Sequence, residues 1–185
     1  MSDCSASGAF DEIQECLLVV ANDLFAGQCI DAAHVASSTG APVIRGDGVA
    51  AIIGFAADGA RGALVLLGER PTVRALQPEG LPAHGEDADA LCDLLSEFSN
   101  MLLGRLKNHL LSRGVVLMLA TPTSAIGGSL RMLSPTADAS MWHEFGTPTG
   151  SVFVRFDATF EPGFELGAPT SAEPAAVSEG DMMLF

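Results

Sequence analysis

The sequence predicts one α/β domain, in which an antiparallel or mixed sheet carries two long helices packed on one of its faces. Two long stretches repeat apolar residues at three- and four-residue steps, which is typical of amphipathic helices. Several shorter stretches are continuously apolar or alternate apolar and polar residues, which is typical of strands. The chain of 185 residues is long enough to bury one core, so we expect a single domain with a short tail.

The first half of the chain predicts one helix and one hairpin. Residues 1–9 are small and polar, and we expect them to be a flexible end. Apolar residues at helical spacing predict the first long helix over 10–25. After a loop expected at 37–42, the runs 49–55 and 63–67 are separated by a turn rich in glycine and predict a β-hairpin.

The second half contains the strongest helical pattern of the chain, over 86–113, with acidic residues at its start and basic residues near its end. A continuous apolar run predicts a strand at 115–120, and shorter runs predict strands at 129–133 and 164–166. Residues 151–160 alternate apolar and polar side chains. This pattern predicts a half-buried strand at the side of an antiparallel sheet.

The composition changes after Gly167. Ser, Ala, Pro, Glu and Gly dominate, and acidic residues occur there without a basic one. We therefore expect residues 168–185 to be a disordered acidic tail and the folded domain to span 10–167. The tail ends in the apolar residues 182–185, and it is interpreted either as a solubilising tail or as a docking peptide.

The composition also narrows the classes of function. Nine Lys and Arg against 23 Asp and Glu give a net charge of −14, so we expect neither nucleic acid nor a membrane surface as a partner. A run of about 18 apolar residues, as a membrane-spanning helix requires, does not occur, and the N-terminus lacks the pattern of a secretion signal. The cysteines form no C-x-x-C pair and the histidines lack ligand spacing. We expect a reduced, cytoplasmic protein with no metal site of its own.

The helix at 86–113 carries the functional signal. On a helical wheel its apolar residues form one arc that is wide enough to pack on a sheet. The opposite arc is polar and of low bulk, and we call it the polar stripe: Asp93, Glu97, Asn100, Gly104 and Asn108. Solvated helix faces usually use better helix formers than Asn and Gly, which cost up to about 1 kcal/mol relative to Ala. The stripe is interpreted either as an ordinary solvated face or as a surface that another protein approaches closely.

This helix resembles the signature helix of the CheX/CheC/FliY chemotaxis phosphatases in the stretch E-F-S-N-M-L-L-G-R-L-K-N-H-L, which begins at Glu97. The family pattern is an acid or Ser, then E-x-x-N, and a Pro further downstream. The residues in these places are Asp93, Glu97, Asn100 and Pro122. In the first helix Glu15 is followed three residues later by Leu18 instead of Asn, so the chain has one copy of the motif. One copy resembles the CheX branch, and the weaker resemblance over residues 8–167 implies the CheX-like fold and a homodimer.

The resemblance implies a protein phosphatase that hydrolyses the aspartyl-phosphate of a CheY-like response regulator. Glu97 would dock on a lysine of the regulator, and Asn100 would orient the attacking water, because an amide donates and accepts hydrogen bonds without titrating. The residues implied to line the contact are Asp93, Met101, Gly104 and Asn108. The protein would need no cofactor of its own, since the regulator would supply Mg²⁺ and phosphoryl transfer depends mainly on positioning and charge stabilisation.

Two alternatives remain open. A non-catalytic CheC-like adaptor would bind a response regulator or signalling partner without hydrolysing anything. An enzyme acting on a small molecule would use Glu97 as a buried base, and it would need a pocket over the stripe. An outward-facing stripe on a long helix argues against such a pocket.

Overall fold

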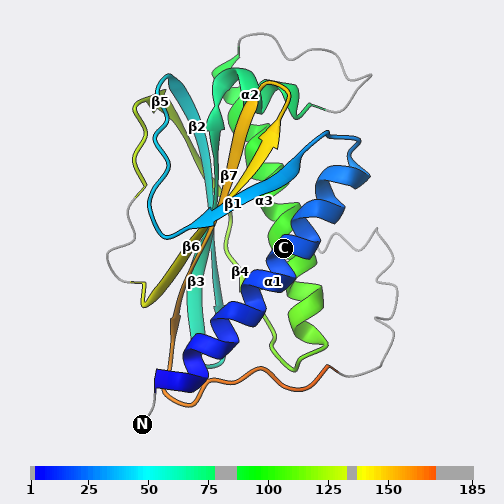
Figure 1. Ribbon diagram of the computed structural model, residues 1–185, viewed down its shortest axis with the longest axis vertical. Coiled ribbons are helices and arrows are strands. Elements are labelled where there is room, and N and C mark those ends of the chain that lie inside the picture. The colour runs from blue at the N-terminus through cyan, green and yellow to red at the C-terminus, as the bar shows by residue number, and fades with distance from the viewer. Residues whose placement is uncertain (1–2, 78–86, 133–136, 170–185) are drawn as a thin grey trace.

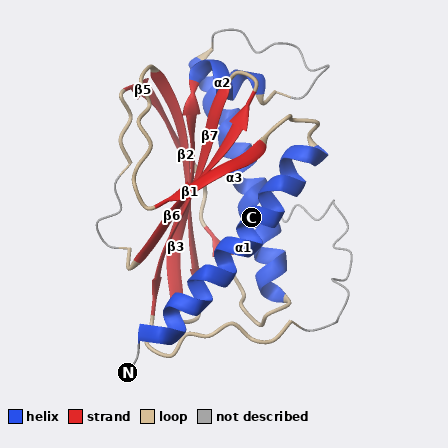
Figure 2. Cartoon of the chain, viewed as in Figure 1, coloured by secondary structure: helices blue, strands red, loops and turns tan. Residues whose placement is uncertain are grey.

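The computed structural model describes residues 3–77, 87–132 and 137–169. The predicted fold class is confirmed: an antiparallel sheet carries two long helices on one face (Figures 1 and 2). The strand order is β1-β6-β7-β3-β2-β4, and β5 also pairs with β2. The elements are α1 (Asp3–Gly27), β1 (Ala33–Ser38), β2 (Asp47–Ala57), β3 (Ala60–Glu69), α2 (Arg70–Ala75), α3 (Ala88–Leu111), β4 (Met118–Leu119), β5 (Thr123–Gly128), β6 (Ala139–Thr147) and β7 (Gly150–Phe160).

The predicted hairpin is confirmed as β2 and β3, and both strands are longer than expected. They pair in continuous register from Gly48 with Glu69 to Ala57 with Ala60. Gly59 in the turn has φ +72°, a conformation that glycine adopts without the steric penalty of a side chain. The hairpin therefore lies in the middle of the sheet, with apolar residues of β2 under the helices.

Both long helices are confirmed, with shifted ends. The helix expected over 10–25 is α1, so the end expected to be flexible, 1–9, is helical from Asp3 onward. The helix expected over 86–113 is α3, which begins after Asp87, whose carboxylate accepts a hydrogen bond from the Asp89 amide at 3.1 Å. The two helices lie beside each other, and α3 packs across β2 (Figure 1).

Two of the predicted strands are misplaced. Of the apolar run 115–120, only the short strand β4 pairs with β2. The run is half-buried, with Val115 and Leu117 in the core and Val116 and Met118 exposed. The strand predicted at 129–133 occurs earlier, as β5, because Ser129 has φ +56°, which is incompatible with a strand. Residue 133 lies outside the described residues.

Other parts of the sheet were not predicted at all. β1 occupies residues that include the start of the loop expected at 37–42, and every residue of β1 is exposed. β6 begins shortly after residues 133–136, which lie outside the described residues, and it pairs with both β1 and β7. The strand predicted at 164–166 does not form; Phe164 is nevertheless buried and stacks on Phe160 with ring centroids 5.0 Å apart.

The strand predicted at 151–160 is confirmed as β7, but its predicted place at the side of the sheet is wrong. β7 lies between β6 and β3, and its polar face is buried as well. Arg155 Nε donates to Asp157 Oδ1 at 2.6 Å, and the Arg155 guanidinium lies 5.3 Å from the centre of the Trp142 ring. Loop residues including Ile44 and Leu130 cover this face, so the charged pair is enclosed although no helix lies over it.

Further predictions concern the tail, the cysteines and membrane-spanning helices. The predicted tail lies outside the described residues from Thr170 onward. The cysteines 16, 29 and 92 are free thiols. Among the described helices, none is long and apolar enough to cross a membrane.

Close packing between β3 and β7 makes Gly62 irreplaceable. A Cβ at this position would lie 1.9 Å from the carbonyl oxygen of Asp157, and this oxygen belongs to the paired backbone of β7. We expect Gly62→Ala to lower the free energy of unfolding by about 1–3 kcal/mol, measured by urea denaturation. The matched control is Gly104→Ala in α3, where a Cβ meets nothing within 4 Å. The control should be more stable by about 0.5–1 kcal/mol, and equal stability of the two variants would contradict the argument.

Candidate functional site

The rotation of α3 about its own axis is determined by the side chains that it buries. Leu95 and Leu102 are fully buried. The Phe98 ring stacks on Phe25 of α1 with centroids 6.4 Å apart, and Phe25 lies 5.2 Å from Phe145 of β6. These contacts connect α3 to both α1 and the sheet. Because side chains leave a helix in fixed directions, they also determine which residues face away from the core.

A polar residue within the motif is accommodated in this buried arc. Ser99 has no exposed surface, and its hydroxyl donates to the carbonyl oxygen of Ser96 at 2.7 Å. The hydrogen-bonding need of Ser99 is therefore met inside the helix. The helix runs unbroken through the E-x-x-N motif, so the acid and the amide keep regular helical spacing.

The polar stripe lies on the side of α3 that faces away from the core. Exposed side chains there belong to Asp93, Glu97 and Asn108, while Asn100 and Gly104 are half-buried. Met101, at the border, is partly buried against the core. The structure thus places all the residues implied for docking and catalysis on one helix.

Glu97 and Asn100 present two unused functional groups at the centre of the stripe. Residues three apart on a helix have Cβ atoms about 5–6 Å apart, so the two side chains are neighbours. Neither side chain makes a hydrogen bond or an ion pair with any other residue in the described part of the chain. A carboxylate that only accepts and an amide that both donates and accepts are therefore free for groups of another molecule.

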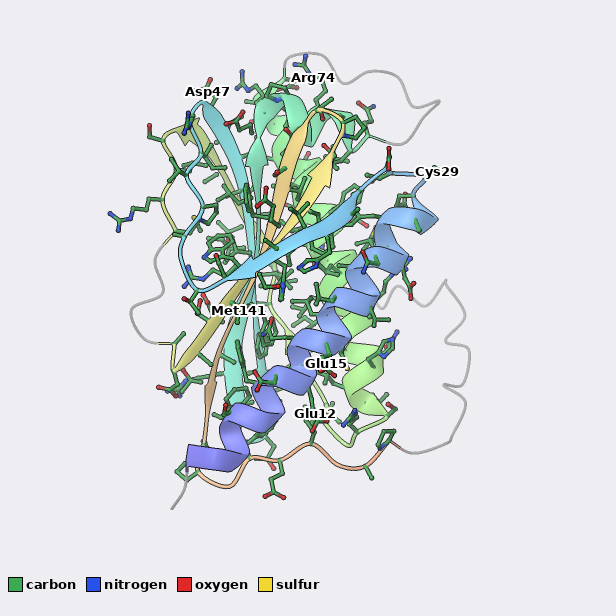
Figure 3. All side chains as sticks on the ribbon, viewed as in Figure 1. Glu12, Glu15, Cys29, Asp47, Arg74 and Met141 are labelled. Carbon is green, nitrogen blue, oxygen red and sulfur yellow. The ribbon has the colours of Figure 1, made fainter. Side chains whose placement is uncertain are left out.

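The first helix has no equivalent pair. Glu15 on α1, labelled in Figure 3, is exposed, but Leu18 three residues later is partly buried against the core. Glu12, one turn earlier, pairs with Arg113 just beyond the end of α3. Glu15 therefore has no amide one turn after it, and Glu12 has a structural role.

Pro122 lies where the chain leaves one stretch of pairing with β2 and begins another. The amide of Ala120 donates to Gly54 at 2.9 Å, and pairing resumes with Thr123 opposite Ile52. A residue without an N–H fits this interruption. The described contacts of Pro122 are thus those of a strand boundary.

Sequence reasoning missed one exposed residue of this face. Leu111 lies three residues after Asn108 and is 54% exposed. It adds an apolar group at the end of the stripe, where Val116 and Met118 are also exposed. The helical spacing of Leu111 relative to Gly104 and Asn108 was the signal that could have identified it.

The two best-defined hollows among the described residues lie away from the stripe. Their volumes are about 310 and 190 Å³, and the first lies between β1, β6 and β7 and the second beside the end of α1. Neither is lined by a residue of the stripe, so the alternative of a small-molecule enzyme with a pocket over Glu97 gains no support. Within the described ranges, no three or more His, Cys, Asp and Glu side chains gather to hold a metal ion.

Comparison with known proteins agrees with this fold. Residues 49–146, a range that contains all of α3, match the family model described as chemotaxis phosphatase CheX. A comparison with curated protein sequences finds no match.

Solved structures with the same fold include three from chemotaxis. A CheC-like protein from Shewanella oneidensis is 20% identical with a TM-score of 0.67, and the match covers 82% of this chain and 97% of that chain. CheX from Vibrio vulnificus is 19% identical with a TM-score of 0.64, covering 80% and 93%. A CheX–CheY–BeF₃–Mg²⁺ complex from Borrelia burgdorferi matches with 16% identity and a TM-score of 0.61, covering 78% and 96%. The family model matches more than half of the residues of this chain. The chain therefore belongs to the chemotaxis phosphatase CheX family.

Proposed function

We propose that the protein hydrolyses the aspartyl-phosphate of a CheY-like response regulator that docks on the polar stripe of α3. The observation that carries the proposal is the pair Glu97 and Asn100, which lies on the outward face of a buried helix with no partner among the described residues. Membership of the CheX family supports the reaction. The neighbour from Borrelia burgdorferi, a complex of CheX with CheY, supports the kind of partner.

Asn100 acts on the water in this proposal. Its amide enters the partner's reaction centre and holds a water molecule in line with the bond between phosphorus and the aspartate oxygen. The water oxygen bonds to phosphorus as that bond breaks, and the aspartate carboxylate leaves. Asn100 is not a base, because an amide does not titrate near neutral pH. Asn100 contributes to the reaction only by positioning the attacking water.

Glu97 fixes the register of the two proteins. Its carboxylate pairs with a lysine of the response regulator through a charge-assisted hydrogen bond. Gly104 allows the partner to approach the helix backbone, since no side chain projects there. The remaining docking contacts are those of Asp93, Met101 and Asn108. The response regulator supplies Mg²⁺, and the charge of the transferring phosphoryl group is stabilised there.

Two further parts of the proposal follow the family resemblance. We propose that the protein is cytoplasmic, where response regulators act, and that it is a homodimer. The alternative function, a non-catalytic adaptor that binds a response regulator or another signalling partner, would use the same surface. Turnover of the phosphorylated partner by catalytic amounts of the protein separates the two.

The first test removes the amide. Asn100→Ala should slow dephosphorylation of a phosphorylated response regulator by about a hundredfold or more while binding changes little, because only the water loses its position. The measurement is loss of label from the regulator. Asn22→Ala, at an exposed asparagine of α1, is the matched control and should keep full activity. Persistence of the label with the wild-type protein would leave the adaptor function.

The second test removes the docking charge. Glu97→Gln should raise KM for the phosphorylated regulator by about tenfold or more, with a smaller effect on kcat, since a charge-assisted hydrogen bond to the partner is lost. Glu15→Gln removes an exposed acid of α1 that has no amide beside it, and it should change neither constant. Equal effects of the two substitutions would show general steering by charge, without a specific contact of Glu97.

The third test fills the flat part of the stripe. Gly104→Ala should weaken binding of the regulator by about tenfold, although the helix itself becomes more stable by about 0.5–1 kcal/mol. Binding is measured by titration and stability by urea denaturation of the same preparation. A loss of binding in a stabilised protein is a direct steric effect at the interface. Unchanged binding would place the interface elsewhere.

A further inference from the structure

A chain of side-chain hydrogen bonds lies between α1 and the edge of the sheet, on elements that the proposed phosphatase site does not use. The hydroxyl oxygen of Ser37 on β1 is 2.8 Å from Nδ1 of His143 on β6 and 3.0 Å from Nε2 of His34. Nε2 of His143 is 2.7 Å from Oε1 of Gln14 on α1. His143 is 2% exposed and Gln14 is 6% exposed, whereas Ser37 and His34 are exposed. An accessible hydroxyl thus has a shielded imidazole behind it.

The partners determine where the protons lie. The carbonyl oxygen of Gln14 can only accept, so His143 carries its proton on Nε2 and donates it to Gln14. Nδ1 of His143 is then unprotonated and accepts the hydroxyl proton of Ser37. The Ser37 oxygen in turn accepts from Nε2 of His34. This is the order of nucleophile, base and orienting group that activates serine and cysteine nucleophiles.

A β-bulge in β1 brings His34 and Ser37 to the same side of the strand. His34 lies opposite Phe145 and Ala36 opposite Glu144, so Val35 is an extra residue in the register. In a regular strand, residues three apart point to opposite faces. The bulge cancels that alternation, and bulges commonly re-aim side chains next to functional sites.

Gln14 is retained at a cost to stability. Its Nε2 is buried and has no hydrogen-bond partner in the described part of the chain. Leaving a buried donor unpaired costs about 1–3 kcal/mol, and an apolar side chain at this position would instead leave the Nε2–H of the buried His143 unpaired. The contact that Gln14 does make is the one to His143. Gln14 therefore both satisfies the buried imidazole and fixes its orientation.

His143 is neutral near pH 7. Burial, and secondarily the neighbouring His34, lower the pKa of His143 to about 4. The charged residues of α1 nearest to Gln14 in sequence, Asp11, Glu12 and Glu15, are exposed, and β7 places Val154 opposite His143. The base form is therefore present throughout the physiological range.

We propose that Ser37 is an activated hydroxyl that accepts an acyl group from a small activated ester, with His143 as its base and Gln14 as a positioning residue. The Ser37 oxygen bonds to the acyl carbon, and the bond from that carbon to the leaving oxygen or sulfur breaks. The hydroxyl proton moves to Nδ1 of His143 and is then passed to the leaving group. His34 donates a hydrogen bond to the Ser37 oxygen and orients that oxygen for attack on the acyl carbon. The product is an acylated Ser37.

The probe for this reaction is p-nitrophenyl acetate, with p-nitrophenolate release followed by absorbance and the acetylated residue identified by peptide mass mapping. Ser37 should be acetylated at least about tenfold faster than Ser38, because it has a general base. Ser38 is the neighbouring exposed serine, and its hydroxyl donates to the carbonyl oxygen of Gly40 instead. Ser37→Ala should abolish the stoichiometric release, and Ser38→Ala should preserve it. Equal acetylation of the two serines would overturn the proposal.

The pH profile and a gain-of-function variant separate activation from a structural role. With His143 as base, the acetylation rate should be flat above about pH 5, whereas an unassisted hydroxyl reacts about tenfold faster with each pH unit as hydroxide rises. Gln14→Glu places a carboxylate on Nε2 of His143, which raises the pKa of His143 and should speed acetylation by about tenfold at about pH 8. A misfolded protein would not gain this rate. A wild-type rate that climbs with hydroxide, or a Gln14→Glu rate no faster than wild type, would refute activation by His143.

Discussion

Burial of one arc of α3 determines where the opposite arc points, and the proposed chemistry depends on that orientation. Successive residues of a helix differ by about 100°, so a turn of the helix by one residue would carry Glu97 toward the core. An ionised carboxylate buried without a partner costs several kcal/mol. Full burial of Leu95 and Leu102 and the contact between Phe98 and Phe25 oppose the same turn. Apolar packing on one side therefore positions polar groups on the other without any polar contact to hold them.

The parts of the fold that could be predicted are those whose pattern is local. The helices α1 and α3 are predicted by helical periodicity, and the β2–β3 hairpin is predicted by two apolar runs around a glycine turn. Neither signal depends on residues that are distant in sequence. β1 could not be predicted in this way, because its residues are exposed and it becomes a strand by pairing with β6. The charged face of β7 was misplaced for a related reason. Arg155 and Asp157 are hidden by loop residues that are far away in sequence.

The two candidate sites differ in the same respect. The polar stripe could be assembled from sequence because all its residues belong to one helix, so spacing alone places them on one face. The Ser37 cluster combines α1, β1 and β6, and Ser37 and His143 are 106 residues apart. His34 faces Ser37 only because of a β-bulge at Val35, and the residue types of the strand do not predict that bulge. Sequence reasoning identified the histidines as scattered, and only the pairing of β1 with β6 brings two of them together.

Local departures from good folding chemistry coincide with both sites. Asn100 and Gly104 are poor helix formers in the middle of a long helix, and Gln14 leaves a buried amide unpaired. Packing does not require Gly104, since a Cβ there meets nothing within 4 Å. Residues that break local rules without a structural gain are most simply explained by what they present to another molecule. For α3 that molecule is large enough to need a flat surface. For Ser37 we propose a small activated ester, whose acyl carbon can reach the exposed hydroxyl.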